Sequence, residues 1–247
     1  HDGDADRIVV VRADGSIVHE DTILAILSEY FVDESDTSDP VVVTTPNVSG
    51  RVDERVRAAG GRVERTALGT LHEGIADILE AGDDETDVVF AGEPWKCIHP
   101  QLGIWTDGIS TAAILGRLIA ERSLEALIEP ITERPLRKDP VECPDGAKAA
   151  AMKRLETVLP EQYPEASVSL DYGVRLELPD GSWFLVRPSG TEPYIRVYVE
   201  SDDVDELLEK VTDTVEAGGE PTVVSQTVWC DWTSRPPSQS AAWSGYI

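Results

Sequence analysis

Apolar segments without polar interruptions alternate with helix-like segments between residues 40 and 133. PVVVTT (40–45) and DVVFAGE (87–93) have the composition of buried strands, and SGRVDERVRAAGG (49–61) and TLHEGIADILEAG (70–82) have the apolar spacing of helices. Continuous apolar strands joined by helices are typical of a mostly parallel sheet covered on both faces. The sequence therefore predicts a mixed-sheet, three-layer α/β domain over residues 40–133. Ligands of such sheets bind beyond the carboxyl ends of the strands.

A different pattern begins near Pro135. The segment 144–159 has helical spacing, whereas SVSLDYGVRLELPDGSWFLVRPS (167–189) alternates with period two around a Pro-Asp-Gly turn. YIRVYVES (194–201) continues this alternation and is followed by a helix-like segment that ends near Gly218. Such alternation is typical of antiparallel strands. The sequence thus predicts a smaller α+β C-terminal domain, an antiparallel sheet with helices, over residues 134–218.

The two ends of the chain fit neither domain. Residues 8–12 have strand composition and residues 21–31 have helical spacing, so we interpret residues 1–31 as the C-terminal end of a preceding α/β domain. Residues 219–247 are rich in Trp and Ser and include a Pro-Pro pair. We expect this stretch to be an atypical, poorly ordered tail or sequence foreign to the domain.

The chain is strongly acidic, with 47 Asp and Glu against 21 Lys and Arg and a formal net charge of −26. The basic footprint of a nucleic-acid-binding protein is therefore missing. Self-repulsion at this charge is screened in molar salt, which suggests a halophilic, cytoplasmic protein; an acidic mesophilic protein is the alternative. A halophilic protein would melt at higher temperature in molar KCl. No apolar run in the sequence is long enough to span a membrane, so we expect no membrane partner.

The stretch DGDADR at residues 2–7 places carboxylates at alternate positions. Asp2, Asp4 and Asp6 can curl around one cation because small residues separate them, and three oxygen ligands suit Mg²⁺. An EF-hand loop is excluded, since its sixth position must be Gly and its twelfth Glu, where this chain has Arg7 and Ala13. An aspartyl-phosphate phosphatase and a solvated acidic turn remain as alternatives.

The stretch RPSGTEPYIR at residues 187–196 has the character of an anion site. Arg187 offers a planar guanidinium for phosphate oxygens, and a tight turn follows it. Ser189, Gly190 and Thr191 supply two hydroxyls and several N–H groups in that turn, and Arg196 returns on the next strand. We expect phosphate to bind here; the alternative is an ordinary strand connection with incidental arginines.

The stretch GEPWK at residues 92–96 follows a predicted strand and is a candidate sugar site. Glu93 could bind sugar hydroxyls, Trp95 could stack on a sugar face, and Lys96 could contact a substrate phosphate. A surface loop with a half-buried Trp explains the same residue types equally well.

Together the three motifs resemble those of the α-D-phosphohexomutase family, which includes phosphoglucomutase, phosphomannomutase and phosphoglucosamine mutase. DGDADR resembles the family's metal loop, RPSGTEP its phosphate-binding loop, and GEPWK stands where the family has a sugar-specificity loop, usually G-E-x-S-G-H. The resemblance covers Asp2 to about Gly218 in family order. Trp95, Lys96 and Cys97 depart from the pattern, which leaves the identity of the hexose open.

The resemblance implies a Mg²⁺-dependent exchange of hexose 1-phosphate and hexose 6-phosphate through a phosphoserine and a bisphosphate intermediate. It implies that the three aspartates bind Mg²⁺, that Arg7 stabilises the transferred phosphoryl group, and that the RPSGTEP and GEPWK residues bind the hexose phosphate. It also implies that the chain is truncated, since the family's first domain, with its T-A-S-H-N-P-like serine loop, has no counterpart here. We therefore expect this chain to lack turnover by itself. Within the family we expect the phosphoglucomutase/phosphomannomutase type. A non-catalytic sugar-phosphate-binding protein and a phosphoglucosamine mutase are the alternatives.

Overall fold

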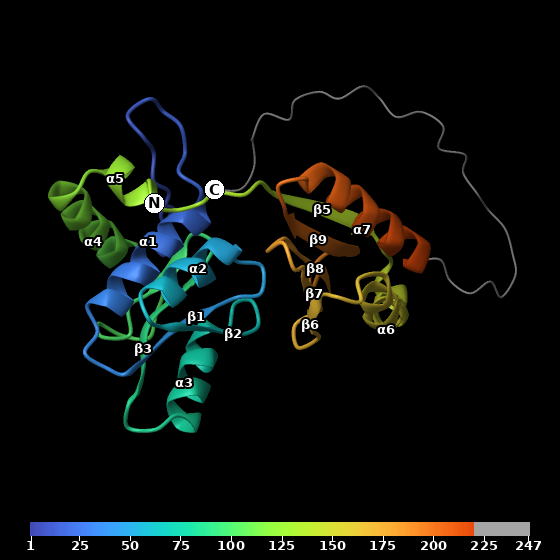
Figure 1. Ribbon diagram of the computed structural model, residues 1–247, viewed down its shortest axis with the longest axis horizontal. Helices are drawn as coiled ribbons and strands as arrows, with labels where there is room; N and C mark the ends of the chain where they lie inside the picture. The colour runs from blue at the N-terminus through green and yellow to red at the C-terminus, as the bar shows by residue number, and fades with distance from the viewer. Residues whose placement is uncertain (220–247) are drawn as a thin grey trace, which may run out of the picture.

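The computed structural model describes residues 1–219, which form two domains, each built on its own sheet (Figure 1). The elements of the first domain are α1 (Glu20–Asp33), β1 (Asp39–Thr44), α2 (Gly50–Ala58), β2 (Arg62–Arg65), α3 (Leu71–Ala81), β3 (Thr86–Glu93), β4 (Lys96–Ile98), α4 (Gly108–Glu121) and α5 (Leu124–Ile128). The elements of the second are β5 (Leu136–Glu142), α6 (Asp145–Gln162), β6 (Ser167–Ser169), β7 (Val174–Glu177), β8 (Trp183–Pro188), β9 (Tyr194–Glu200) and α7 (Val204–Gly219). The atypical stretch 219–247 predicted from the sequence lies, from residue 220 onward, outside the described residues.

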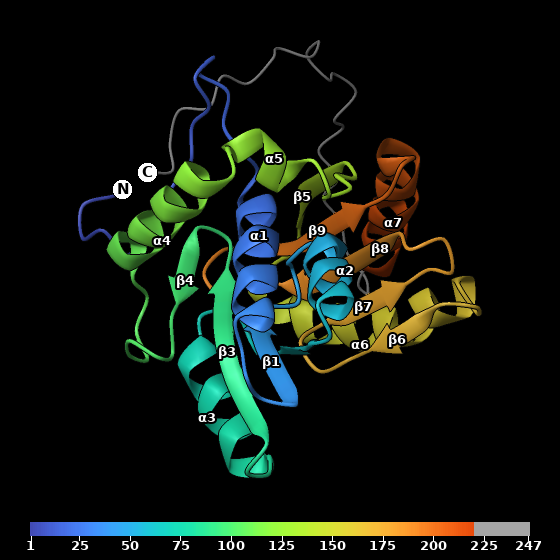
Figure 2. The ribbon, with the colours of Figure 1, turned by 60° about the vertical axis from the view of Figure 1, so that its left-hand side comes forward.

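The first sheet has the strand order β2-β1-β3-β4, with β1 parallel to both neighbours and β4 antiparallel to β3. Side chains alternate between its faces: Val42 packs with α1 and α2, whereas Val41 and Val43 pack with Leu71 and Ile75 of α3. Helices thus cover both faces (Figure 2). The predicted mixed-sheet, three-layer α/β domain is confirmed.

Helix α1 belongs to the core of this first domain. Leu24 and Leu27 are buried in one cluster with Val42 and Phe90. The structure differs from the prediction that residues 1–31 are the end of a preceding domain, because the apolar face of α1 is buried against this sheet.

The segment 8–12 forms no regular strand among the described residues, although its composition predicted one. Within it Val11 makes an isolated bridge to Ile17, and Arg7, just before the segment, makes one to Lys96. Val9 and Val11 are 45% and 56% exposed. Strand formation depends on a neighbouring strand as much as on β-branched residues, and the described chain offers this segment no continuous one.

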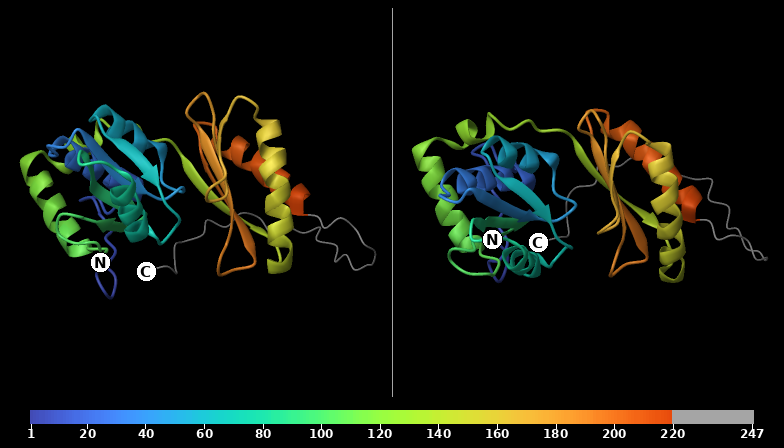
Figure 3. Two further views of the ribbon diagram at one scale, coloured as in Figure 1. Left: turned by 90° about the horizontal axis from the view of Figure 1, so that it is seen from below. Right: turned by 60° about the horizontal axis from the view of Figure 1, so that its bottom comes forward.

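The second sheet is antiparallel throughout, in the order β5-β9-β8-β7-β6. Helices α6 and α7 cover one face, and the opposite face, which carries Trp183, Leu185 and Tyr198, is turned toward the first domain (Figure 3). The predicted α+β C-terminal domain is confirmed. Strand β5 was not predicted: it is an edge strand with charged residues and Pro140, which is tolerated only at edges.

Contacts of buried arginines join the two domains. The Arg175 guanidinium lies 3.9 Å from the Trp183 ring centroid and donates to the Pro46 carbonyl oxygen of the first domain. Arg51 of α2 donates to the Arg134 carbonyl oxygen, 3.0 Å away, just before β5. Within residues 1–219, no helix combines the length and apolar character that crossing a membrane requires.

Candidate functional site

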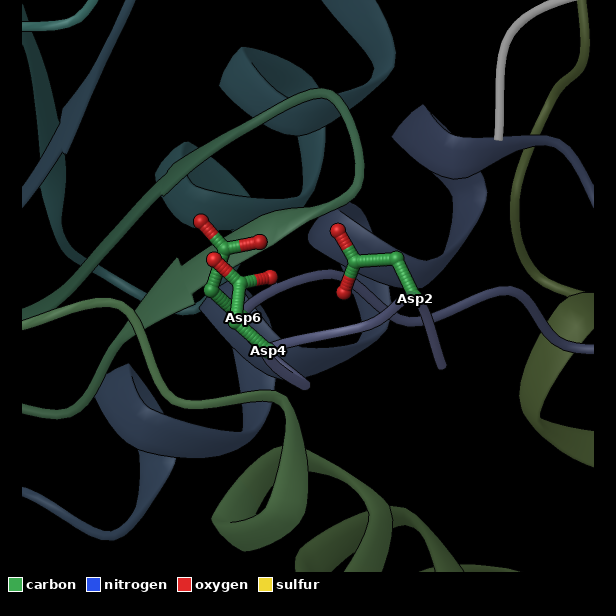
Figure 4. A group of neighbouring side chains, drawn as sticks. All are labelled: Asp2, Asp4 and Asp6. Atoms are coloured by element: carbon green, nitrogen blue, oxygen red, sulfur yellow. The ribbon is translucent and has the colours of Figure 1, made fainter.

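The metal loop (residues 2–7) brings its three carboxylates together. Asp2, Asp4 and Asp6 each offer an oxygen such that these atoms lie within 4.8 Å of one another. Figure 4 shows Asp4 and Asp6 side by side, with Asp2 facing them. Opposite ligands of octahedral Mg²⁺ are about 4.2 Å apart, so a small contraction would give Mg²⁺ three oxygen ligands and leave positions for water or phosphate. The donor set therefore fits Mg²⁺.

Two cations pair with these carboxylates. Arg7 Nε donates to Asp2 Oδ2 at 2.6 Å, and Lys96 Nζ lies 2.8 Å from Asp6 Oδ2. Burial alone would raise the pKa of Asp2, but its hydrogen bonds from Arg7 keep that pKa below its usual value. The lowered pKa keeps the Asp2 carboxylate ionised at neutral pH and able to bind a cation.

The metal loop packs on the first turn of α4. Gly108 N–H donates to the Ala5 carbonyl oxygen at 3.2 Å, and Ala5 has a φ of 60°. A Cβ at position 108 would lie 2.6 Å from that same oxygen. Glycine is therefore required at the start of α4 for the metal loop to approach so closely.

The sugar turn (residues 93–96) connects β3 to β4 beside the metal loop. Glu93 and Lys96 are opposite each other in the antiparallel pair, and Trp95 has a φ of 70°. The Trp95 carbonyl oxygen accepts a hydrogen bond of 3.1 Å from Ile8 N–H. The structure thus joins two motifs that are separated by about 90 residues in the sequence.

Glu93 and Cys97 have different environments at the end of this sheet. Glu93 Oε2 accepts a hydrogen bond of 3.1 Å from Gly69 N–H, which orients the carboxylate toward the loop after β2. Cys97 is 2% exposed, and burial raises the pKa of its thiol to about 12. Glu93 remains a candidate for binding sugar hydroxyls, whereas Cys97 is a core residue with an unreactive thiol.

Arg187 and Arg196 are direct cross-strand neighbours in β8 and β9. Both lie on the face of the sheet opposite α6 and α7, because residues adjacent to them in sequence, Val186 and Val197, are buried in the core under those helices. Like charges placed directly opposite each other destabilise a sheet. An anion bound between the two guanidinium groups would remove this repulsion.

The surroundings of the two arginines leave them partly uncompensated. Arg196 forms an ion pair with Glu192, where both side chains are about two-fifths exposed. Arg187 lies 5.9 Å from the Tyr198 ring centroid, and its Nε is buried without an acceptor among the described residues. A buried donor without an acceptor is unfavourable, so Arg187 in particular favours an incoming oxygen ligand.

The phosphate loop (residues 189–193) connects these two strands. Ser189 is buried at 4% exposure and its N–H donates to the Tyr194 carbonyl oxygen, whereas Gly190 and Thr191 are exposed. The N–H groups of residues 190–192 donate to no acceptor within the described part of the chain. Successive free amides of this kind form an anion-binding nest.

A hollow of about 540 Å³ lies beside the phosphate loop, and this volume falls within the usual range for small-molecule sites. Its lining includes Thr191 and Arg196 of the predicted site together with Lys138 of β5. Lys138 Nζ is 3.4 Å from Glu20 at the start of α1. One residue that lines the hollow is therefore also in contact with the first domain.

Lys148 of α6 is a component of the site that the sequence motifs did not reveal. It is 9% exposed, and its ammonium donates to the carbonyl oxygens of Ser189, at 2.8 Å, and of Glu192. It also lies 2.6 Å from an Asp145 carboxylate oxygen. The available signal was a single lysine in the Ala-rich stretch GAKAAAM.

Comparison with known families matches most of the chain. Residues 19–134 match "Phosphoglucomutase/phosphomannomutase, alpha/beta/alpha domain III", and residues 141–217 match "Phosphoglucomutase/phosphomannomutase, C-terminal domain". A phosphopentomutase of Thermococcus kodakarensis is 40% identical over 87% of this chain and 47% of its own length. A probable phosphoglucosamine mutase of Methanopyrus kandleri is 40% identical over 87% of this chain and 46% of its own length.

Solved structures share the fold. A phosphoglucomutase/phosphomannomutase family protein from Burkholderia thailandensis aligns with a TM-score of 0.70 at 20% identity, over 87% of this chain and 45% of that one. An Aspergillus fumigatus N-acetylphosphoglucosamine mutase, solved with GlcNAc-6P and magnesium, aligns with a TM-score of 0.60 at 17% identity, over 87% of this chain and 51% of that one. This chain spans slightly under half the length of the curated relatives cited above.

Proposed function

The chain belongs to the phosphoglucomutase/phosphomannomutase family, whose domain III and C-terminal domain it carries, and we propose that it provides the metal-, sugar- and phosphate-binding part of a phosphohexomutase. The observation that carries the proposal is the opposed pair Arg187 and Arg196 beside a loop with free amide groups. Two arginines in direct cross-strand register repel each other, and a phosphate bound by both would offset this repulsion.

The phosphate loop binds the phosphate that does not react. Arg187 and Arg196 donate to its oxygens, and Gly190 and Thr191 contribute N–H groups and a hydroxyl. Ser189 is buried and stabilises the turn through its hydrogen bond to the Tyr194 carbonyl oxygen. This arrangement recognises the charge and shape of phosphate and leaves the sugar free to extend toward the first domain. Glu93 then binds sugar hydroxyls, and Lys96 contacts the other phosphate when it is released from Asp6.

Asp2, Asp4 and Asp6 are the residues that would bind Mg²⁺. Bound there, Mg²⁺ would neutralise charge on the phosphoryl group being transferred. Arg7 lies beside Asp2 and adds a second positive charge for the same phosphoryl oxygens. We assign the phosphoryl donor to a phosphoserine outside these 247 residues, so the partner needed for turnover is a phosphoserine-bearing domain.

The substrate proposed is a hexose phosphate, exchanged between its 1- and 6-phosphates. Two relatives at 40% identity are named phosphopentomutase and probable phosphoglucosamine mutase. Ribose 1-phosphate and glucosamine 1-phosphate should therefore be tested beside glucose 1-phosphate. The sugar turn carries Trp95 and Lys96, and differences in affinity among the three ligands would report its selectivity.

Titration calorimetry tests the proposal directly. We expect glucose 1-phosphate to bind the chain in the presence of Mg²⁺, and binding to weaken roughly ten- to hundredfold in Arg196→Met, since a charge-assisted hydrogen bond contributes about 1.5–3 kcal/mol. Equal affinity of wild type and Arg196→Met would refute the phosphate site. We expect no conversion to glucose 6-phosphate by the isolated chain; measurable turnover would refute the assignment of the phosphoryl donor to another domain.

A further inference from the structure

We propose that Lys148 is a positioning residue for the phosphate loop: its ammonium fixes the Ser189 carbonyl group on the α6 side, so that the Gly190 N–H faces the ligand. This inference rests on the proposed phosphate-binding function. It concerns a residue on a helix outside the RPSGTEP motif, 41 positions from Ser189.

The orientation follows from the geometry of a trans peptide. The C=O of one residue and the N–H of the next lie in one plane and point in opposite directions. The Ser189 carbonyl oxygen accepts a hydrogen bond of 2.8 Å from Lys148 Nζ and is thereby directed toward α6. The Gly190 N–H must then point away from α6, toward the opposite side of the sheet, where Arg187 and Arg196 lie.

A second contact fixes the other end of the loop. Lys148 also donates to the Glu192 carbonyl oxygen, which accepts a further hydrogen bond of 2.8 Å from Tyr194 N–H. One ammonium thus binds carbonyl oxygens on both sides of Gly190 and Thr191. Without it, these carbonyl groups could rotate toward the ligand side, where their partial negative charge would repel phosphate.

The burial of Lys148 supports this role over that of a general positive charge. Its side chain is 11% exposed and its ion-pair partner Asp145 is 81% exposed. An ammonium in this position is desolvated, which is unfavourable unless its hydrogen bonds are made. Two carbonyl oxygens and one carboxylate oxygen satisfy its three N–H donors, so the contacts to the loop are specific.

The test uses the full chain and inorganic phosphate as the probe. Affinity is measured by following the amide resonances of Gly190 and Thr191 in ¹H–¹⁵N spectra, well below the unfolding temperature. We expect Lys148→Met to weaken phosphate binding roughly ten- to hundredfold, the usual consequence of losing a charge-assisted contact. Lys148→Arg, which keeps charge and donors, should restore part of this affinity.

Lys153→Met is the matched control, because Lys153 is an exposed lysine on the same helix. It should bind phosphate as wild type does, which separates positioning from loss of charge. Should Lys148→Met fail to fold, Lys148→Gln, which keeps a donor but loses the charge, is measured in the same way. A purely structural role would lower the unfolding temperature of these variants and leave the affinity of the folded molecules unchanged.

The outcomes separate the two proposals. If phosphate shifts neither loop amide in wild type, the phosphate site itself is refuted and this inference with it. If wild type binds phosphate and the folded Lys148 variant binds it equally well, only the positioning role is refuted.

Discussion

Replacing Arg187 with methionine should stabilise the protein while weakening phosphate binding. Methionine has a similar unbranched stem, so it preserves the packing of the side chain and removes only the guanidinium group. Opposite effects on stability and affinity are the expected behaviour of a residue retained for ligand binding.

The stability change combines three contributions at this position. Removing a like charge directly opposite Arg196 stabilises by about 0.2–1 kcal/mol. Removing the buried Nε that lacks an acceptor among the described residues stabilises by about 1–3 kcal/mol. Losing the guanidinium 5.9 Å from the Tyr198 ring centroid destabilises by about 0.5–1 kcal/mol. The expected net effect is a stabilisation of about 2 kcal/mol, and each kcal/mol raises the unfolding temperature by roughly 4–8 °C for a domain of this size.

Scanning calorimetry and titration calorimetry measure the two effects. The unfolding temperature of the C-terminal domain should rise in Arg187→Met, and affinity for glucose 1-phosphate should fall roughly ten- to hundredfold. Wild type should also gain stability when the sugar phosphate is added, and the variant should lose most of this gain, because only binding to the folded state stabilises.

Arg137→Met is the control for the change in net charge. Arg137 lies on β5 of the same sheet, is largely exposed, and is 3.8 Å from Asp205 rather than near the phosphate loop. Its replacement should leave both stability and affinity almost unchanged. If Arg187→Met destabilises the domain and binds glucose 1-phosphate normally, Arg187 is a structural residue and not a phosphate ligand.

Three further predictions concern other parts of the site. Gly190→Ala should leave stability unchanged or raise it by about 0.4–1 kcal/mol, because a Cβ at this position meets no heavy atom within 4 Å. The same methyl group should weaken phosphate binding by obstructing the loop, and a destabilised variant would contradict this prediction. Lys96→Met should bind Mg²⁺ several times more tightly by titration calorimetry, because the metal no longer displaces the ion pair with Asp6; weaker binding would contradict the assigned metal loop. Burial and the charge of Glu20 raise the pKa of Asp21 to about 7, so ionisation of this carboxyl should lower the stability of the fold as pH rises from about 4 to about 7. Asp21→Asn should remove that part of the pH dependence of the urea midpoint, and parallel pH profiles of wild type and variant would contradict this prediction.

The first domain could be predicted well because its strands are buried on both faces. β1 and β3 are continuous apolar segments, and their composition alone distinguishes them from the helices between them. β5 could not be predicted, since Val141 is its main buried residue and its strand character comes from pairing with β9. Residues 8–12 were predicted as a strand but form none in the described part of the chain, because β-branched residues cannot supply the neighbouring strand that pairing requires.

The site could be predicted only where neighbouring residues carry its chemistry. The carboxylates of DGDADR and the turn of RPSGTEP are local patterns, so the sequence revealed them. The direct opposition of Arg187 and Arg196 depends on the register of two strands, and the contact of Lys148 with the loop depends on how α6 packs on the sheet. Neither the register nor the packing is encoded in a short motif.

The relative placement of the metal loop and the phosphate loop depends on helix α1 and on the buried side chain of Arg51. Glu20 lines a small pocket with Ile8 and Trp95 near the metal loop, and it also pairs with Lys138, which lines the hollow beside the phosphate loop. Arg51, 3% exposed, fixes α1 to the interdomain link by donating to Thr22 Oγ1 at 2.9 Å and to the carbonyl oxygen before β5. Satisfied buried networks are rigid, and removing one member leaves groups unpaired at a cost of about 1–3 kcal/mol each. The spacing between the metal loop and the phosphate loop therefore depends on the contacts of Arg51 with α1 and with the interdomain link.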